Sequence, residues 1–214
     1  MTVKKNVFVK KKAIFFEKVL PDPNFRMDSQ VDVNVRIITA EDIPKIEAKF
    51  EVFKTATIEE RFQAGHVGFG AELGGEIVHV SWFSFGDVFV DSLRRRMRLD
   101  SESAYVYDGF TLPECRGLGI IGKTFSEALQ YLYTQRGIKK FYVAISHANF
   151  PMQKVVQREG LHKIGAITYT RIMKWGVIRF EGATKEDREH LKKMFSLKTV
   201  SRQVIIALPK STHK

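Results

Sequence analysis

A glycine-rich stretch in the middle of the chain has the composition of an anion-binding loop. Gly117, Gly119 and Gly122 punctuate it, and Arg116 and Lys123 place positive charges near its two ends. Helical periodicity begins directly after the loop, and the first backbone N–H groups of a helix have no acceptor within that helix. Because glycine lets the main chain come close to a phosphate, this stretch predicts a site for a phosphate-bearing ligand.

The stretch also satisfies a nucleotide-binding pattern. Residues 117–124 match G-x-x-x-x-G-K-[ST], in which the lysine (Lys123) reaches the outer phosphates and the hydroxyl residue (Thr124) binds magnesium. Such a P-loop follows directly from a buried strand and needs a second strand that ends in an acid. Here Pro113 and its neighbours intervene before the loop, and no acid follows the next apolar stretch, residues 141–145. The context disfavours a P-loop nucleotide-binding protein, which stays an alternative.

A second pattern fits more of the chain. The run L-P-E-C-R-G-L-G, residues 112–119, resembles the signature of the GNAT superfamily of acyl-CoA-dependent N-acetyltransferases. In that signature a Gln or Arg, two residues, a Gly, one residue and a Gly or Ala cradle the coenzyme A pyrophosphate. Arg116 and Gly119 fill two of the three positions, whereas Ile121 departs from the third and Gly122 follows one residue late. The resemblance implies an acetyl-CoA site made by Arg116, Gly117, Leu118, Gly119, Ile120, Ile121, Gly122 and Lys123.

The resemblance continues downstream of the loop. Asn149, Met152, Val155, Gly160 and Leu161 are spaced like the family's second motif, and the whole match extends over residues 33–175. In between, residues 139–145 take the place of the strand that splays from its neighbour to admit the pantetheine arm. The implied fold is α/β (α+β): a GNAT-like mixed, mostly antiparallel sheet with a V-shaped splay at its central strands, flanked by helices.

The resemblance also assigns cofactor contacts outside the loop. The main chain of Gly109, Phe110 and Thr111 corresponds to the backbone that pairs with the pantetheine amides like an added strand. Asn149 belongs to the second motif and is expected near the cofactor.

The strand before the loop carries the candidate catalytic side chains. The resemblance places Tyr107 and Tyr105 where some family members have the His or Glu that deprotonates the amine. Since a tyrosine is mostly protonated near neutral pH, we expect Tyr107 first, and then Tyr105, to orient the acceptor or relay a proton. Asp108 is the nearest carboxylate and ranks third, because strand alternation puts it on the opposite face unless a bulge turns it round.

Val156 departs from the family pattern. Many members have a Tyr there, which hydrogen-bonds or protonates the departing coenzyme A thiolate. In this chain that role passes to water, to another tyrosine such as Tyr169, or to no group. The resemblance therefore supports cofactor binding more strongly than catalysis.

Candidate acceptor-binding residues lie on the strand predicted at residues 76–85, which follows a Gly74-Gly75 hairpin signal. Trp82 and Phe85 lie there and could line an acceptor pocket, although core packing is the simpler explanation. In the family resemblance, the helices predicted after Thr39 form one wall of this pocket. The arginine cluster at residues 94–98 could capture an acidic acceptor, but we expect a solvated insertion loop.

Composition limits the possible partners. The chain has 214 residues, 44% of them hydrophobic, and a net charge of +11. A core of ordinary size is expected, and the charge is explained most simply by a solvated basic surface, so we expect no nucleic-acid partner. A single cysteine excludes an internal disulfide, and no Cys/His cluster has metal-ligand spacing. The lysine-rich N-terminus is too interrupted for a signal peptide or a membrane span, which predicts a cytoplasmic protein.

We expect three parts in the chain. Residues 1–32 form an N-terminal strand or hairpin with a linker, and residues 33–180 form the GNAT-like acyltransferase domain. Residues 181–214 contain a charged helix at 185–195 and a strand at 200–208. This tail could pair with the N-terminal strand, cover the acceptor site or mediate a homodimer.

Together these features predict an enzyme, a GNAT-type acetyl-CoA-dependent N-acetyltransferase. Its acceptor would be an amine of a small molecule or peptide that attacks the thioester directly, so that positioning supplies most of the acceleration. The alternatives are a non-catalytic acyl-CoA sensor, a P-loop nucleotide-binding protein and a basic nucleic-acid-binding module.

Overall fold

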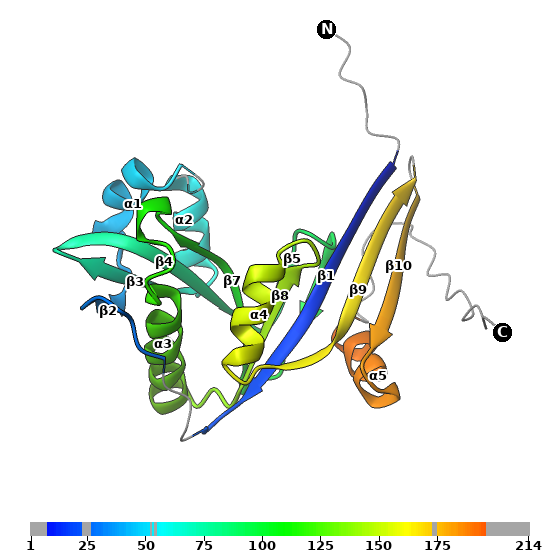
Figure 1. Ribbon diagram of the computed structural model, residues 1–214. Coiled ribbons are helices and arrows are strands. Elements are labelled where there is room, and N and C mark those ends of the chain that lie inside the picture. The colour runs from blue at the N-terminus through cyan, green and yellow to red at the C-terminus, as the bar shows by residue number, and fades with distance from the viewer. Residues whose placement is uncertain (1–7, 23–26, 52, 54, 173–174, 196–214) are drawn as a thin grey trace, which may run out of the picture. The chain divides into compact units, whose positions relative to one another are not determined.

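The chain forms two units, each assembled from segments that are distant in the sequence. The computed structural model describes residues 8–22, 27–51, 53, 55–172 and 175–195 (Figure 1). The first unit combines Met1–Glu17, Asp87–Arg98 and Ala144–Lys214, and the second combines Lys18–Gly86 and Leu99–Val143. The glycine loop and the strand with the candidate catalytic residues both belong to the second unit.

The sheet of the second unit is mixed and mostly antiparallel, as the sequence predicts. Its strands are β2 (Asn34–Ile37), β3 (Val67–Leu73), β4 (Glu76–Phe85), β7 (Ser103–Thr111) and the first part of β8 (Lys140–Ser146), in the order β8-β7-β4-β3-β2. Only the pair β7 and β8 is parallel. Gly74 and Gly75 join β3 to β4 with φ angles of 58° and 83°, which is the conformation that a two-residue hairpin turn requires.

The parallel pairing of β7 with β8 is short. It covers residues 103–106 opposite residues 140–143. Beyond this point the described partners of β7 lie on β4, where Trp82 pairs with Tyr107 and His79 with Thr111. β7 therefore stops pairing with its parallel neighbour at the place where the sequence predicts the splay.

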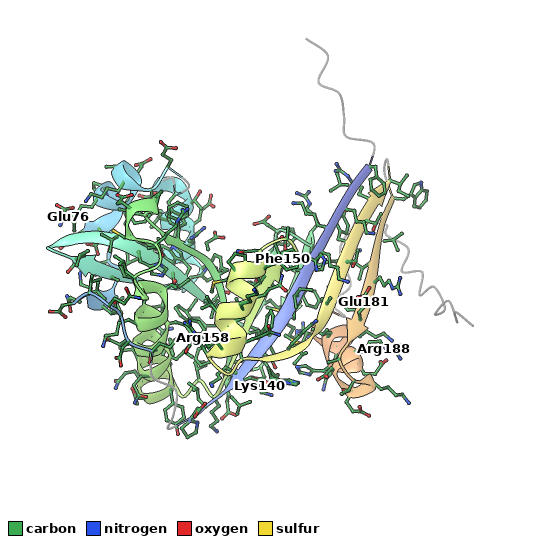
Figure 2. The ribbon with its side chains drawn as sticks, in the orientation of Figure 1. Glu76, Lys140, Phe150, Arg158, Glu181 and Arg188 are labelled. Carbon is green, nitrogen blue, oxygen red and sulfur yellow. The ribbon has the colours of Figure 1, made fainter. Side chains whose placement is uncertain are left out.

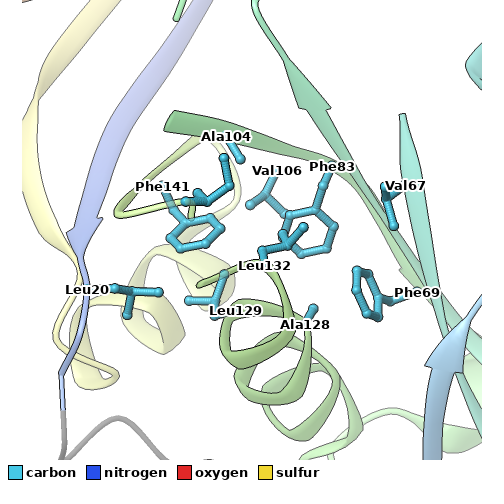
Figure 3. Close-up of a cluster of buried hydrophobic side chains, with 11 residues drawn as sticks. Leu20, Val67, Phe69, Phe83, Ala104, Val106, Ala128, Leu129, Leu132 and Phe141 are labelled. Carbon is cyan, nitrogen blue, oxygen red and sulfur yellow. The ribbon is translucent and has the colours of Figure 1, made fainter. Parts of the chain in front are cut away.

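Helix α3 (Ile120–Arg136) covers one face of this sheet. The sequence predicts this helix to within one residue at each end, and it stops at Gly137, whose φ is 65°. The helix buries an apolar stripe against the strands (Figure 3). The cluster contains Leu20, Val67, Phe69, Phe83, Ala104, Val106, Ala128, Leu129, Leu132, Ile138 and Phe141.

Short helices cover the opposite face. They are η1 (Ala40–Asp42), α1 (Ile43–Lys49) and α2 (Thr55–Gln63). Phe83 packs with α3, whereas its neighbour Trp82 packs with the short helices, as alternation along a strand requires. The predicted helix after Thr39 begins as a 3-10 turn, in which Thr39 and Asp42 form a capping box.

A three-residue ion network holds this helix start to the sheet. The Arg36 guanidinium donates to both carboxylate oxygens of Asp42, each at 2.7 Å, and its Nη2 donates to Glu72 Oε1 at 2.6 Å. The Asp42 side chain is buried. The hydrogen bonds from Arg36 lower the pKa of Asp42 from 3.8 to about 2.

This network makes the protein sensitive to acid. The pKa of Asp42 is lower in the folded state, so its contribution is fully present above pH 3.8 and is lost as the pH falls through about 2. We expect a loss on the order of 2 kcal/mol in the free energy of unfolding, measured by urea titration at a series of acidic pH values. Asp42→Asn should remove this part of the pH dependence, and Glu51→Gln, at an exposed carboxylate, should keep it. An unchanged slope in Asp42→Asn would contradict the assignment.

The first unit is built on three antiparallel strands. They are β1 (Phe8–Val19), β9 (His162–Ile172) and β10 (Trp175–Gly182), with β9 in the middle, and the unit also contains α4 (Phe150–Arg158) and α5 (Lys185–Met194). Phe195, at the end of α5, contacts Phe15 and Phe180, with ring centroids at 5.5 and 6.3 Å. Lys12 on β1 pairs with Glu181 on β10 at 2.8 Å. Figure 2 labels Glu181.

Strands are predicted near both ends of the chain. The N-terminal stretch that the sequence predicts as a strand or hairpin is the single strand β1. The strand predicted at residues 200–208 lies outside the described residues. No helix in the described ranges is long and apolar enough to cross a membrane.

The prediction that the arginine cluster lies in a solvated loop is wrong. Residues 87–98 form a hairpin of β5 (Asp87–Val90) and β6 (Arg95–Arg98). Arg95 and Met97 are buried, whereas Arg94, Arg96 and Arg98 are exposed. The alternation of a strand explains this pattern, since residues two apart share a face.

Candidate functional site

The glycine loop forms the N-terminal end of α3. It follows the short helix η2 (Pro113–Cys115), and Gly117 and Gly119 have φ angles of 82° and 78°. The first bond of the helix runs from Lys123 N to Gly119 O at 3.1 Å. The N–H groups of residues 120–122 therefore precede the hydrogen-bonded part of the helix and can donate to an anion.

Arg116 is anchored beside this loop. Its Nε donates to the carbonyl oxygen of Thr111 at 3.1 Å, and its guanidinium lies 5.3 Å from the centre of the Phe110 ring. The residue is exposed. The anchoring bond uses one edge of the planar group, and the other edge, with the two terminal nitrogens, has the geometry that binds a phosphate.

Two other residues of the loop make contacts within the helix. Thr124 is fully buried, and its hydroxyl donates to the carbonyl of Ile120 at 2.9 Å. A hydroxyl held in this way is not placed to bind magnesium, so the P-loop alternative has no support in the geometry. Lys123 Nζ pairs with Glu127 at 2.7 Å, one turn further along α3.

The glycines of the loop are required for a reason that the sequence does not reveal. A Cβ at Gly119 would lie 2.8 Å from the carbonyl oxygen of Asp28, and a Cβ at Gly122 would lie 3.0 Å from Met27 Sδ. The segment of residues 27–31 thus packs directly against the loop. Sequence reasoning explained these glycines by the approach of a phosphate alone, whereas here they also admit another part of the chain.

Tyr107, the first candidate catalytic residue, is paired with a histidine. Its hydroxyl lies 2.6 Å from Nδ1 of His66, and the two rings meet edge to face with centroids at 5.6 Å. Burial raises the pKa of Tyr107, while burial and the nearby Arg61 lower the pKa of His66. Both groups are therefore neutral near pH 7, and the short distance places a hydrogen bond between them.

Asp108 reaches the same region through a bulge. The pairing of β4 with β7 shifts register between Val80 and Trp82, and Asp108 has a φ of 46°. Its carboxylate pairs with Arg61 at 2.6 Å, and the same guanidinium lies 5.0 Å from the centre of the Tyr107 ring. Asp108 therefore shares a face with Tyr107, which is the exception that the alternation argument had left open. Its role as a base stays a prediction, in competition with its ion pair.

The remaining aromatic candidates are packed side chains. Tyr105 is buried and stacks on Tyr107 with centroids 6.1 Å apart. Trp82 is fully buried, and Phe85 lies 5.1 Å from the guanidinium of Arg136. This is the packing expected of core residues, and a role for Trp82 or Phe85 in an acceptor pocket stays a prediction.

A second histidine lies buried beside the end of β7. His79 is fully buried, with Nδ1 at 2.7 Å from Thr111 Oγ1 and Nε2 at 2.6 Å from Ser81 Oγ. Burial lowers its pKa to about 3, so it remains neutral. A Cβ at Gly109 would lie 3.3 Å from Ser81 Oγ. This network therefore lies directly beside residues 109–111, which are the predicted contacts of the pantetheine arm.

The predicted residues of the second motif lie in the first unit. Asn149 caps α4, and its Oδ1 accepts a hydrogen bond from Met152 N at 3.3 Å. Val156 on α4 and Tyr169 on β9 are both buried. The contact of Asn149 with a cofactor and the contribution of Tyr169 stay predictions.

Sequence reasoning missed the partners of the candidate residues. His66, Arg61 and Ser29 carry no motif, and each joins the site only through the fold, Ser29 by a hydrogen bond from its hydroxyl to the carbonyl of Leu118 in the glycine loop. Among the described residues, no group of three His, Cys, Asp or Glu side chains could hold a metal ion.

Comparisons with known proteins identify the fold. No protein-family model and no curated protein matches the sequence. Among solved structures, the chain is similar to a GNAT-family protein from Novosphingobium aromaticivorans, with a TM-score of 0.54 and 14% identity over 86% of this chain and 71% of that one. It is also similar to the aminoglycoside N-acetyltransferase AAC(6')-Iy in complex with CoA (TM-score 0.48, 22% identity, 59% of this chain and 90% of that one).

A third similar structure is the ribosomal-protein-alanine N-acetyltransferase of Brucella melitensis biovar Abortus, with a TM-score of 0.45 and 15% identity over 59% of this chain and 89% of that one. Of the three scores, only the first exceeds 0.5, and the comparison rests on it. At this level of identity the similarity establishes a shared fold.

Proposed function

We propose that this chain, which has the fold of the GNAT acetyltransferases, transfers an acetyl group from acetyl-CoA to an amine. The observation that carries the proposal is the combination of two features that lie close together in the sequence. The glycine loop opens α3, and β7, which precedes the loop, carries Tyr107, whose hydroxyl lies 2.6 Å from Nδ1 of the neutral His66. The first feature suits the phosphates of a coenzyme, and the second suits the removal of a proton from an attacking amine.

The residues of the loop fit the pyrophosphate of acetyl-CoA. Arg116 and the N–H groups of residues 117–122 would bind its oxygens, and the main chain of residues 109–111 would pair with the pantetheine arm. Lys123 would join them by exchanging Glu127 for a phosphate oxygen. When bound, acetyl-CoA supplies an activated acetyl group as a thioester. The chain's own contribution is to orient the two reactants, an effect that needs no reactive side chain.

Tyr107 and His66 would handle the proton of the amine. As the nitrogen attacks the acetyl carbon, the phenol oxygen accepts a proton from it and passes its own proton to Nδ1 of His66. The lowered pKa of His66 keeps the imidazole neutral, and therefore able to accept this proton, at and somewhat below neutral pH. The C–N bond forms, the C–S bond breaks, and the coenzyme A thiolate takes a proton from water.

One observation favours a second candidate, a non-catalytic acyl-CoA sensor. Val156 is a buried aliphatic residue on α4 and can supply no proton to a thiolate. Such a protein would bind acetyl-CoA in the same loop and would acetylate no amine. A screen of small amines and peptides with detection of free coenzyme A separates the two functions.

Binding of acetyl-CoA can be tested through Arg116. We expect acetyl-CoA and coenzyme A, but not Mg-ATP, to raise the melting temperature of the wild type. Arg116→Ala should weaken acetyl-CoA binding about tenfold or more, because it removes a charged donor to phosphate. Affinity is measured by isothermal titration calorimetry.

The matched control is Lys139→Ala. Lys139 is also exposed and charged, but it pairs with Glu102 and follows the other end of α3. Lys139→Ala should leave the affinity for acetyl-CoA unchanged. Stabilisation by Mg-ATP alone would refute the proposal, as would stabilisation by none of the three ligands.

A further inference from the structure

The segment of residues 27–31 holds one peptide group of the glycine loop. The carbonyl oxygen of Leu118 accepts two hydrogen bonds from this segment, from Gln30 N at 2.8 Å and from Ser29 Oγ at 2.9 Å. The hydroxyl of Ser29 in turn accepts a hydrogen bond from Val31 N at 3.2 Å. Ser29 thus uses its hydroxyl both as a donor to the loop and as an acceptor within its own segment.

These bonds determine the direction of an N–H group. The carbonyl of Leu118 and the N–H of Gly119 belong to the same planar peptide unit. This unit does not precede a proline, and it is trans. In a trans unit the C=O and N–H bonds point in opposite directions, so a carbonyl held by Ser29 and Gln30 turns the N–H of Gly119 away from them.

Close contacts with residues 27–31 keep the glycine loop from rotating toward that segment. Gly119 and Gly122 are already in close contact with Asp28 and Met27, because an added Cβ would lie 2.8 Å from the Asp28 carbonyl oxygen at Gly119 and 3.0 Å from Met27 Sδ at Gly122. The segment of residues 27–31 therefore backs the loop on one side. The N–H of Gly119 therefore points to the side that the segment leaves open.

We propose that Ser29 is a positioning residue for the pyrophosphate of acetyl-CoA. Through its bond to the Leu118 carbonyl it orients the N–H of Gly119 toward the ligand before binding, and it makes no contact with the ligand itself. Preorganised donors bind an anion more tightly because they need not be ordered during binding. This inference rests on the proposed function, since it names a further residue of the same site.

The test compares two acetyl donors on Ser29→Ala. Acetyl-CoA carries the pyrophosphate, whereas S-acetyl-pantetheine carries the same thioester and lacks it. We expect Ser29→Ala to raise the KM for acetyl-CoA about five- to tenfold, which corresponds to the loss of one hydrogen bond, with kcat unchanged. The kcat/KM for S-acetyl-pantetheine should stay at the wild-type value. Ser29→Thr keeps the hydroxyl and should restore the KM for acetyl-CoA.

A matched control removes a similar bond elsewhere in the same unit. Thr134 Oγ1, near the C-terminal end of α3, donates to the carbonyl of Gln130 at 2.9 Å. Thr134→Ala should leave the kinetic constants for both acetyl donors at their wild-type values.

The outcomes separate this inference from the proposed function. An equal loss with both donors, or a KM for acetyl-CoA that does not change, would overturn the positioning role while the acetyltransferase activity stands. A wild type that neither binds acetyl-CoA in calorimetry nor uses it would instead refute the proposed function. If Ser29→Ala does not fold, Ser29→Cys takes its place with the same expected and contradicting outcomes, because a thiol has nearly the same shape as the hydroxyl and is a much weaker donor.

Discussion

Replacing His66 with alanine is expected to lower kcat at neutral pH about a hundredfold or more. The substitution leaves the phenol of Tyr107 without the group that takes up its proton, and a positioned acid or base is typically worth this much. Tyr107→Phe should lower kcat to a similar degree, and the double variant should cost little more than either single one, because the two groups act as one relay. Steady-state rates with saturating acetyl-CoA and an amine found by screening measure the effect.

The pH profile distinguishes catalysis from a loss of structure. The pKa of His66 is lowered from 6.5, so the wild-type rate should hold at pH 6.5 and fall only at lower pH, as the imidazole becomes protonated. This acidic limb should disappear in His66→Ala. His162→Ala, at an exposed histidine on β9, should keep both the rate and the limb. A His66→Ala enzyme with an unchanged rate would assign the proton transfer to another group, with Asp108 the next candidate.

Gly119→Ala is expected to weaken acetyl-CoA binding about a hundredfold and to destabilise the fold. Two costs add at this position. A φ of 78° is unfavourable for an L-residue, and the new Cβ would lie 2.8 Å from the carbonyl oxygen of Asp28. Either the loop or the segment of residues 27–31 must move, and both movements disturb the N–H groups that face the ligand. Calorimetry with coenzyme A and thermal unfolding measure the two effects.

Gly137 provides a matched control for the strain. Its φ is 65°, it ends the same helix, and a Cβ there would meet nothing within 4 Å. Gly137→Ala should cost about 1 kcal/mol of stability through the backbone conformation alone and should leave coenzyme A binding unchanged. Equal losses of affinity in the two variants would mean that backbone strain, rather than the contact with Asp28, determines the effect at Gly119.

Local sequence determined the elements of the second unit. Gly74 and Gly75 predict their hairpin because few residues besides glycine adopt two consecutive positive φ angles. The apolar stripe and Gly137 predict the extent of α3 for equally local reasons. The loop at Gly117 to Gly119 is likewise visible in the sequence, since glycines and a following helix are sufficient to suggest an anion site. The resemblance to the GNAT signature then indicated the fold that the structure confirms.

The arginine cluster shows where local reasoning fails. A stretch with four arginines reads as solvated, yet Arg95 and Met97 are buried on one face of β6. Whether an arginine in a strand points inward depends on which face the rest of the unit covers. That choice is made by packing, which charge and composition do not encode.

The sequence by itself determined that this chain contains a glycine-rich loop at the start of a helix, preceded by a strand with Tyr107. Only the tertiary structure decided what surrounds them: His66 against Tyr107, Arg61 against Asp108, and Ser29 against the loop. These partners are 41, 47 and 89 residues apart in the chain. Contacts at such separations depend on strand pairing and on a bulge in β7, which arise from packing of the whole unit and not from the spacing of residues along the chain.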